Sequence, residues 1–280
     1  MSRATELPTS REGGPGPPPL RHLVATRYVT ALREGGSVPA VVEADDGGLY
    51  VAKFHGAAQG TRALVAEVIA GELARAAGLP VPELGLIEVD AALGRSEPHQ
   101  EIRELLMASA GLNLAMAFLP GALGYDVAAG HPVSAAFASA LVAFDVFAAN
   151  VDRTARNPNL LWWRGGPWLI DHGASLYWHH GYAGRVDPAE LQASAQRPFA
   201  RVGEHVLLPF ADGLSAAAPA LVAALDDDAI ARAVAAVPEI WLAGDDAREL
   251  RSAYWLWLRA RRSALPQLLE EANRVRAASL

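Results

Sequence analysis

Two carboxylates and one amide lie close together in the middle of the chain. Asp152 stands five residues before Asn157, and Asp171 follows at the end of an apolar run. A carboxylate in the first position can orient an attacking hydroxyl group, while an amide oxygen and a second carboxylate can hold Mg²⁺. That ion would neutralise the charge that spreads over the phosphate oxygens. The residue types and their spacing therefore predict phosphoryl transfer.

The segment around these residues predicts a loop followed by a hairpin. Pro158 forces the residue before it out of the helical region, so the stretch from Asp152 to Asn157 is not expected to be a continuous helix. Apolar residues on both sides of Gly165-Gly166-Pro167 predict two short strands joined by a turn. This hairpin should bring Asp171 back beside Asn157.

Three stretches rich in β-branched or alternating residues predict a small antiparallel sheet near the N-terminus. They cover residues 23–32, 38–43 and 49–54, and Lys53, near the end of the third, is the only lysine of the chain. An exposed lysine on a strand is one interpretation. The acidic loops downstream favour the other, in which the Lys53 ammonium binds phosphate.

A helix is expected from residue 61 or 62 to residue 77, capped by Thr61. It carries Glu67 and Glu72, which lie five residues apart and therefore about 140° around an α-helix. Because both carboxylates cannot face one cleft, only one of them can pair with Lys53.

The composition is that of a globular protein with a sizeable core. The 280 residues are 51% hydrophobic and 20% charged, which suffices for one large lobe or two modest ones. A formal net charge of −7 argues against nucleic-acid binding. The chain has no cysteine, which excludes disulfides, thiolate metal sites and a cysteine nucleophile.

No segment predicts export or insertion into a membrane. The N-terminus lacks the apolar core of a signal peptide, and the apolar stretch over residues 135–149 contains Asp145 and is too short for a span. We expect a cytoplasmic protein that binds no membrane.

Several other polar residues are open to two interpretations. Asp145 is expected to be structural, either a buried acid paired with arginine or a polar edge position. Arg153 is either a substrate contact or half of a structural ion pair. His172, His179 and His180 have no carboxylate at ligand spacing, so a solvated loop is expected there and not a zinc site.

The order of these motifs resembles the HipA-like kinase family. The resemblance is carried by Asn150-Val151-Asp152-Arg153-Thr154-Ala155-Arg156-Asn157-Pro158-Asn159 and by Ile170-Asp171-His172-Gly173, separated by the expected strand pair. Phosphoinositide kinases share a similar arrangement. The resemblance implies a two-lobed α+β kinase-like fold. The small N-lobe would have an antiparallel sheet and one helix, and the larger C-lobe would be mainly helical.

The resemblance also implies roles for individual residues. Asp152 would be the catalytic base, Asn157 and Asp171 the metal ligands, and Lys53 the phosphate ligand. Its partner would be Glu67, which lies six residues ahead of a Leu-Ala pair as in the family.

Glu72, by the same comparison, would face solvent. A nucleotide-phosphate cover would lie at Gly35, Gly36 and Ser37, although an ordinary hairpin turn fits these residues equally well. A hinge near residues 118–123, including Phe118 and Leu119, would bind the adenine through its backbone.

The expected organisation is a disordered leader over residues 1–21, an N-lobe over 22–119 and a C-lobe over 120–280. A short amphipathic helix is expected over residues 101–108, and several helices separated by Pro198, Pro209, Pro219 and Pro238 precede a final long one. The implied cofactors are ATP and Mg²⁺, and the implied activity is a Ser/Thr protein kinase. A small-molecule kinase of the antibiotic-phosphotransferase type and a nucleotide-binding pseudokinase remain alternatives. The acceptor and any regulatory protein partner are not marked in the sequence.

Overall fold

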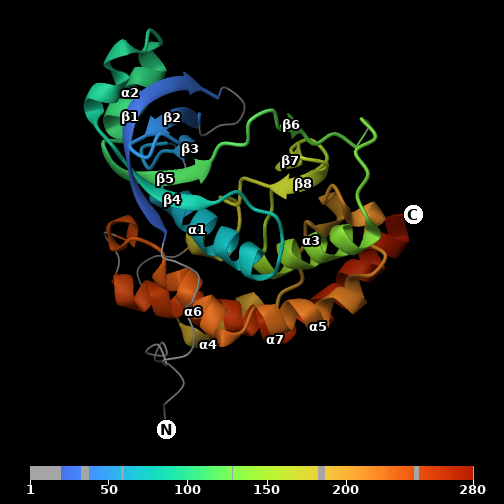
Figure 1. Cartoon of the computed structure of the whole chain (residues 1–280). Coiled ribbons are helices and arrows are strands. Elements are labelled where there is room, and N and C mark those ends of the chain that lie inside the picture. Colours follow the sequence, from blue (N-terminus) through green and yellow to red (C-terminus); the bar gives the residue numbers. More distant parts are fainter. Residues whose placement is uncertain are drawn as a thin grey trace.

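A five-stranded closed barrel forms the N-terminal part of the computed structural model. The structure describes residues 20–32, 38–57, 60–127, 129–181, 187–242 and 246–279, so the expected phosphate cover at Gly35, Gly36 and Ser37 lies outside the described residues. The barrel strands are β1 (Arg21–Ala31), β2 (Ala40–Ala44), β3 (Leu49–Lys53), β4 (Leu84–Val89) and β5 (Gly111–Ala117). They follow the order β1-β2-β3-β5-β4 around the barrel, as the upper left of Figure 1 shows.

The barrel differs from the expected antiparallel sheet in one strand pair. β1 pairs with β4 in parallel, while the other pairs are antiparallel. Closure removes the edges that an open sheet would expose. The first strand begins at Arg21. The turn between β2 and β3 uses Gly47 at a φ of 77°.

Two helices, and not one, accompany the barrel strands. α1 (Gly60–Ala76) begins just before the expected cap Thr61 and ends next to Gly78, whose φ of 75° suits glycine. α2 (Gln100–Ala108) falls on the expected amphipathic stretch. In Figure 1, α1 lies between the barrel and the helices of the C-terminal part, and it contacts β4 on one side and α6 (Asp227–Ala235) on the other.

The C-terminal part is built around α3 (Ala135–Ala148). Its N-cap Ser134 accepts a hydrogen bond from the Phe137 amide at 3.1 Å, and its apolar residues are buried nearly all round. α3 packs against α5 (Leu214–Ala224) and α7 (Ala247–Ser279). Ala149 follows with a φ of 51°, which turns the chain out of the helix and into the loop that carries Asp152.

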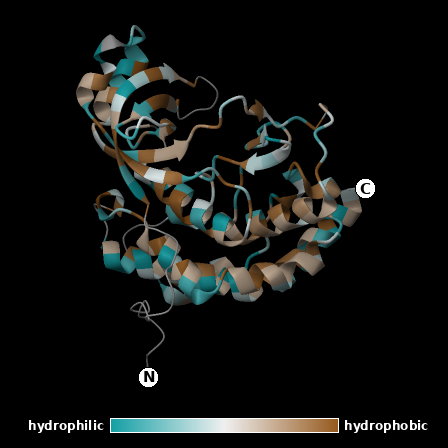
Figure 2. Ribbon diagram, viewed as in Figure 1, coloured by the Kyte–Doolittle hydropathy of each residue, from teal (hydrophilic) through white to brown (hydrophobic). Residues whose placement is uncertain are grey.

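Two further helices pack onto the same C-terminal part. α4 (Pro188–Ala195) and α6 (Asp227–Ala235) also pack against α7. In Figure 2, these helices carry both teal, hydrophilic residues and brown, hydrophobic residues. None of the helices in the described ranges combines the length and apolarity needed to cross a membrane.

The aromatic residues of α7 belong to the core. Tyr254, Trp255 and Trp257 are all buried. Pro219 lies inside α5 instead of separating two helices, so that expectation is wrong. A proline there removes one intrahelical hydrogen bond, while its neighbours Ala218 and Leu221 are buried.

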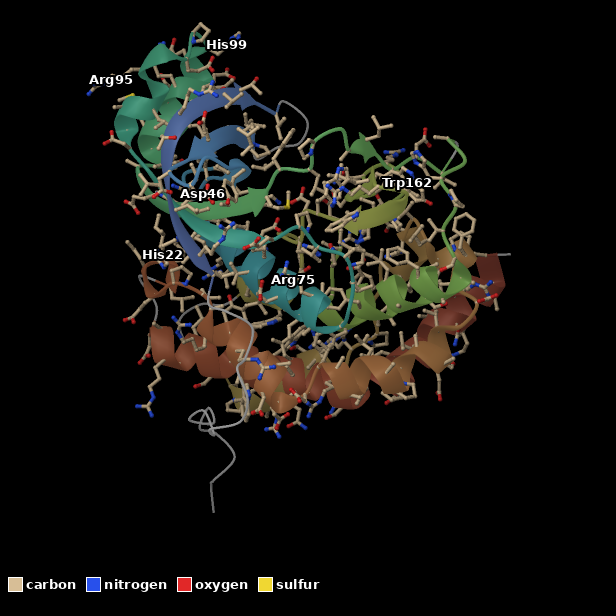
Figure 3. The ribbon with its side chains drawn as sticks, in the orientation of Figure 1. His22, Asp46, Arg75, Arg95, His99 and Trp162 are labelled. Atoms are coloured by element: carbon tan, nitrogen blue, oxygen red, sulfur yellow. The ribbon has the colours of Figure 1, made fainter. Side chains whose placement is uncertain are left out.

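A second, three-stranded sheet carries the segment between the two acidic loops. It consists of β6 (Leu123–Gly124), β7 (Leu160–Trp163) and β8 (Gly166–Leu169). Arg164 and Gly165 both have positive φ, at 50° and 79°, which is the two-residue type I′ geometry that suits a tight hairpin. Trp162, labelled in Figure 3, stacks on His131 with a centroid distance of 4.8 Å. The predicted hairpin is thus confirmed, but its turn is Arg164-Gly165, and Gly166 and Pro167 of the expected turn belong to β8.

Candidate active site

A lysine and two carboxylates meet where the barrel faces α1 and the segment after β8. Lys53, at the end of β3, donates hydrogen bonds from Nζ to Glu67 of α1 and to Asp171 Oδ1, the latter at 2.8 Å. Lys53 and Glu67 are buried, whereas Asp171 keeps 45% of its side chain exposed. One ammonium group therefore joins β3, α1 and the acidic loop.

Lys53 and Glu67 stabilise each other's charged form, whereas Lys53 does not fully offset burial and the Glu67 charge at Asp171, whose pKa is raised. Burial opposes the ammonium form of Lys53, but Glu67 and Asp171 outweigh it and raise the Lys53 pKa. Burial likewise opposes ionised Glu67, but Lys53 and His172 lower the Glu67 pKa below its usual range. Glu67 Oε1 also accepts a hydrogen bond from the Gly173 amide at 2.9 Å, which fixes the backbone two residues beyond Asp171. At neutral pH, Lys53 and Glu67 form a fully charged pair.

The loop after α3 brings a third carboxylate together with two amides. Asn157 Nδ2 donates to Asp152 Oδ2 at 2.8 Å, and Asn159 Nδ2 lies 3.3 Å from the same oxygen. The Asp152 amide in turn donates to Asn150 Oδ1 at 3.1 Å. The stretch from Asp152 to Asn157 contains no helix, as Pro158 predicted. These bonds hold the Asp152 carboxylate in one orientation near the protein surface.

The two acidic segments are joined through the hairpin. Leu160 pairs with Leu169, and the Ile170 amide donates to the Asn159 carbonyl at 3.1 Å. Asp171 directly follows with a φ of 56°, a left-handed conformation that turns its side chain away from the path of β8. The strand pair therefore sets the spacing between the loop of Asp152 and the position of Asp171.

Lys53, Glu67 and Asp171 also line a pocket. Its other walls are small or apolar, and they come from the end of β3, the following loop and the first half of α1. These residues are Phe54, Ala57, Gly60, Ala63 and Leu64. A negatively charged group that enters this pocket would meet the ammonium of Lys53.

Comparison with known proteins identifies the family of the chain. A model of the family described as HipA-like kinase matches residues 26–182, which is more than half of the sequence and includes Lys53, Glu67, Asp152, Asn157 and Asp171. The chain belongs to the HipA-like kinase family. Its membership supports a phosphotransferase activity. No curated protein matches the chain.

A solved structure has a similar fold to this HipA-like kinase. It is the crystal structure of the proinflammatory kinase CtkA of Helicobacter pylori, with 12% sequence identity and a TM-score of 0.55. The alignment covers 90% of this chain and 99% of the other. At this identity the similarity concerns the fold, and the mixed α+β architecture is kinase-like.

Glu72 departs from its expected position in this HipA-like kinase. Its side chain is only 18% exposed and lies 3.7 Å from Arg75 Nε, so it does not face solvent. Burial raises the Glu72 pKa, against the lowering effect of Arg75. α1 also packs against α6 and the 3-10 helix Glu239–Leu242, and contacts between distant segments of this kind cannot be predicted from the helical repeat of α1.

Two of the three histidines after Asp171 are buried, which corrects the expectation of a solvated loop. His172 Nδ1 lies 3.8 Å from Glu67 Oε2. His179 Nδ1 lies 2.9 Å from the Tyr254 hydroxyl, and His179 Nε2 lies 3.2 Å from His180 Nε2. Only His180 is exposed. Within the described ranges, no group of three or more His, Asp or Glu side chains could hold a metal ion.

His179 makes stability depend on pH in acid. Burial, with smaller contributions from His180 and Arg62, lowers the His179 pKa to about 3 from an ordinary 6.5. The unfolded chain therefore binds a proton first as the pH falls, and the folded state loses stability between about pH 6.5 and about pH 3. We expect His179→Gln to flatten the slope of the unfolding free energy by about 1.4 kcal/mol per pH unit below pH 6.

Urea unfolding of wild type and variant between pH 7 and pH 4.5 measures this slope directly. His180→Gln is the matched control, because it leaves His179 buried and should retain most of the wild-type slope. Equal slopes for wild type and His179→Gln would show that this ring does not control acid stability.

Proposed function

We propose that this HipA-like kinase is an ATP- and Mg²⁺-dependent enzyme that transfers the γ-phosphate to a serine or threonine hydroxyl of a protein. The observation that carries the proposal is the Lys53 ammonium bonded to both Glu67 and Asp171. The bond between Asn157 and Asp152 supports it from the neighbouring loop. Phosphoryl transfer needs positioning and charge neutralisation more than covalent chemistry, and these side chains supply both.

Asn157 and Asp171 fit a magnesium ion by the chemistry of their donor atoms. Asn157 uses its amide nitrogen for Asp152, which leaves the amide oxygen for a cation. Asp171 shares only Oδ1 with Lys53 and is partly open to solvent. Mg²⁺ is usually held by one or two such oxygens together with phosphates and water. When bound, the ion would neutralise charge on the phosphate oxygens.

The other side chains would act directly on the substrates. Lys53, held by Glu67, would neutralise a phosphate of the nucleotide. Asp152 would orient the acceptor hydroxyl and accept its proton as the oxygen forms a bond to the γ-phosphorus and the bond to the departing ADP breaks. Hydrogen bonds from Asn157 and Asn159 would keep the Asp152 carboxylate turned toward the acceptor.

The two parts of the chain would divide the work between them. The barrel part, over residues 22–119, would hold the nucleotide, and the part over residues 120–280 would carry the catalytic and metal loops. The Phe118 amide already donates to the Leu49 carbonyl at 3.0 Å. Adenine contacts in the proposed hinge would therefore fall on other backbone groups, such as the Leu119 amide, because the Leu119 carbonyl accepts from the Ala122 amide at 3.1 Å.

Intact-mass spectrometry after incubation with Mg²⁺ and ATP tests this function. We expect the chain to gain whole phosphoryl groups in the presence of both, and to gain none when either is left out. ATP hydrolysis that is stimulated only by a small alcohol or sugar would replace the protein-kinase proposal by a small-molecule kinase. Tight ATP binding with neither transfer nor hydrolysis would contradict the proposal and leave a pseudokinase.

A further inference from the structure

A buried ion pair lies directly behind the loop of Asp152. Arg153 Nε donates to Asp145 Oδ2 at 2.5 Å, and neither side chain has any solvent exposure. Asp145 stands in the last turn of α3, so the pair connects the helix to the loop that follows it. The sequence left Arg153 open between a substrate contact and a structural ion pair, and its burial places it in the second class.

The Arg153 guanidinium also touches the backbone beside each metal-ligand candidate. Nη1 donates to the Asn159 carbonyl and lies 3.5 Å from the carbonyls of Pro158 and Ile170. Pro158 directly follows Asn157, Ile170 directly precedes Asp171, and Arg153 itself directly follows Asp152. One rigid cation therefore contacts the main chain within one residue of all three groups.

His205 completes this arrangement from a distant part of the chain. It is buried, and its Nε2 lies 2.9 Å from Asp145 Oδ2. Its Nδ1 accepts a hydrogen bond from the Leu207 amide at 3.1 Å. A nitrogen that accepts carries no proton in the neutral ring, so the proton lies on Nε2, which donates to Asp145.

The backbone around His205 also pairs with the backbone of the loop that carries Asp152. His205 forms an isolated antiparallel bridge with Thr154, and the Val206 amide donates to the Arg153 carbonyl at 3.1 Å. Burial opposes the ionised form of Asp145, but Arg153 and His205 outweigh it and lower the Asp145 pKa. The segment around His205 is thus attached to the loop of Asp152 by one backbone bridge and to Asp145 of α3 by its side chain.

We propose that His205 is a positioning residue of the kinase reaction. Through Asp145 and Arg153, it holds the loop of Asp152 and the backbone just before Asp171 in a fixed relative position. The inference rests on the proposed function for the roles of those loops. The hydrogen bond from His205 Nε2 orients the Asp145 carboxylate, and this carboxylate orients the Arg153 guanidinium. The guanidinium in turn holds the carbonyls of residues 158, 159 and 170 in place. His205 itself touches no substrate.

Two variants of His205 separate its two nitrogens. Glutamine places an amide nitrogen near the position of Nε2, whereas the shorter asparagine reaches only the position of Nδ1. We expect His205→Asn to speed amide hydrogen exchange at Thr154, Asn157 and Ile170 about tenfold, the effect of losing one hydrogen bond to a charged group. His205→Gln should restore exchange to within about threefold of wild type.

Amides of β3 and β5 are the internal control, because their exchange should stay unchanged in both variants. Equal exchange in wild type and His205→Asn would overturn the proposal, as would a uniform increase over the whole chain in both variants. Where transfer can be measured, kcat should fall in His205→Asn and recover in His205→Gln with an unchanged KM for ATP. A fall that His205→Gln does not rescue would count against the proposal.

A measurement on the wild-type protein needs no variant to fold. Long-range ¹H–¹⁵N spectra of the histidine rings should show His205 as the neutral ring with its proton on Nε2. A proton on Nδ1 would overturn the proposal. Neither this spectrum nor hydrogen exchange uses nucleotide, so failure of the proposed function and failure of this inference are distinguishable.

Discussion

Replacing Asp152 by asparagine is expected to lower the rate of phosphate transfer by about 10²- to 10⁴-fold, the usual contribution of a general base, which is the role proposed for Asp152. The amide cannot accept the hydroxyl proton, yet it has nearly the shape of the carboxylate and can still meet Asn157 and Asn159. ATP binding should therefore survive, because the Lys53 cluster is not altered. The measurement is kcat for transfer together with the dissociation constant for Mg²⁺ and ATP.

Asp212→Asn is the matched control for this experiment. Asp212 is an exposed acid between the helical segments of the C-terminal part, so the same change of chemistry there should leave transfer unaltered. If the Asp152 variant kept its full rate, the assignment of the base would be wrong. If it lost nucleotide binding as well, the acid would belong to the nucleotide site and not to the acceptor site.

Asp145→Ala should lower the free energy of unfolding by about 3–5 kcal/mol, the usual result of removing one partner of a buried ion pair. Arg153 would remain charged in the interior with carbonyl groups alone as partners. His205 Nε2 would also lose its acceptor. Urea unfolding at neutral pH measures the difference.

Glu271→Ala provides the comparison, because Glu271 pairs with Arg274 on the surface of α7, where their side chains are 38% and 72% exposed. An exposed pair contributes about 1 kcal/mol or less. Similar losses in the two variants would mean that the buried pair of Asp145 and Arg153 stabilises the protein no more than an exposed pair does. A second change, Arg153→Met, should return part of the loss in the Asp145 variant.

Most elements of the fold could be predicted because their signals are local. Ser134 as a cap, Gly78 as a helix end and the turn around Gly165 each depend on a few neighbouring residues. The geometric restriction on Glu67 and Glu72 is local too, since it needs only the helical repeat. These signals gave the strands, α1, α3 and the hairpin with small errors at their ends.

The features that could not be predicted depend on contacts between distant segments. Closure of the barrel requires β1 to pair with β4, about sixty residues further on, and no local pattern encodes a parallel partner. The burial of His179 depends on Tyr254 of α7. An acid such as Asp145 in an apolar helix indicates that buried partners are needed, and Arg153 is a candidate because it is near in the sequence. His205 is not, because nothing near it in the sequence marks it.

Thermal unfolding with and without Mg²⁺ and ATP, for wild type and Asp171→Ala, tests the central claim most directly. A ligand that binds only the folded state at about 100 times its dissociation constant stabilises that state by about 2.7 kcal/mol. We predict a rise in the midpoint of the wild type that requires both Mg²⁺ and ATP, and its loss in the variant, where Lys53 keeps Glu67 but the metal ligand is gone. No rise in the wild type at millimolar ATP, or an equal rise in Asp171→Ala, would contradict the account.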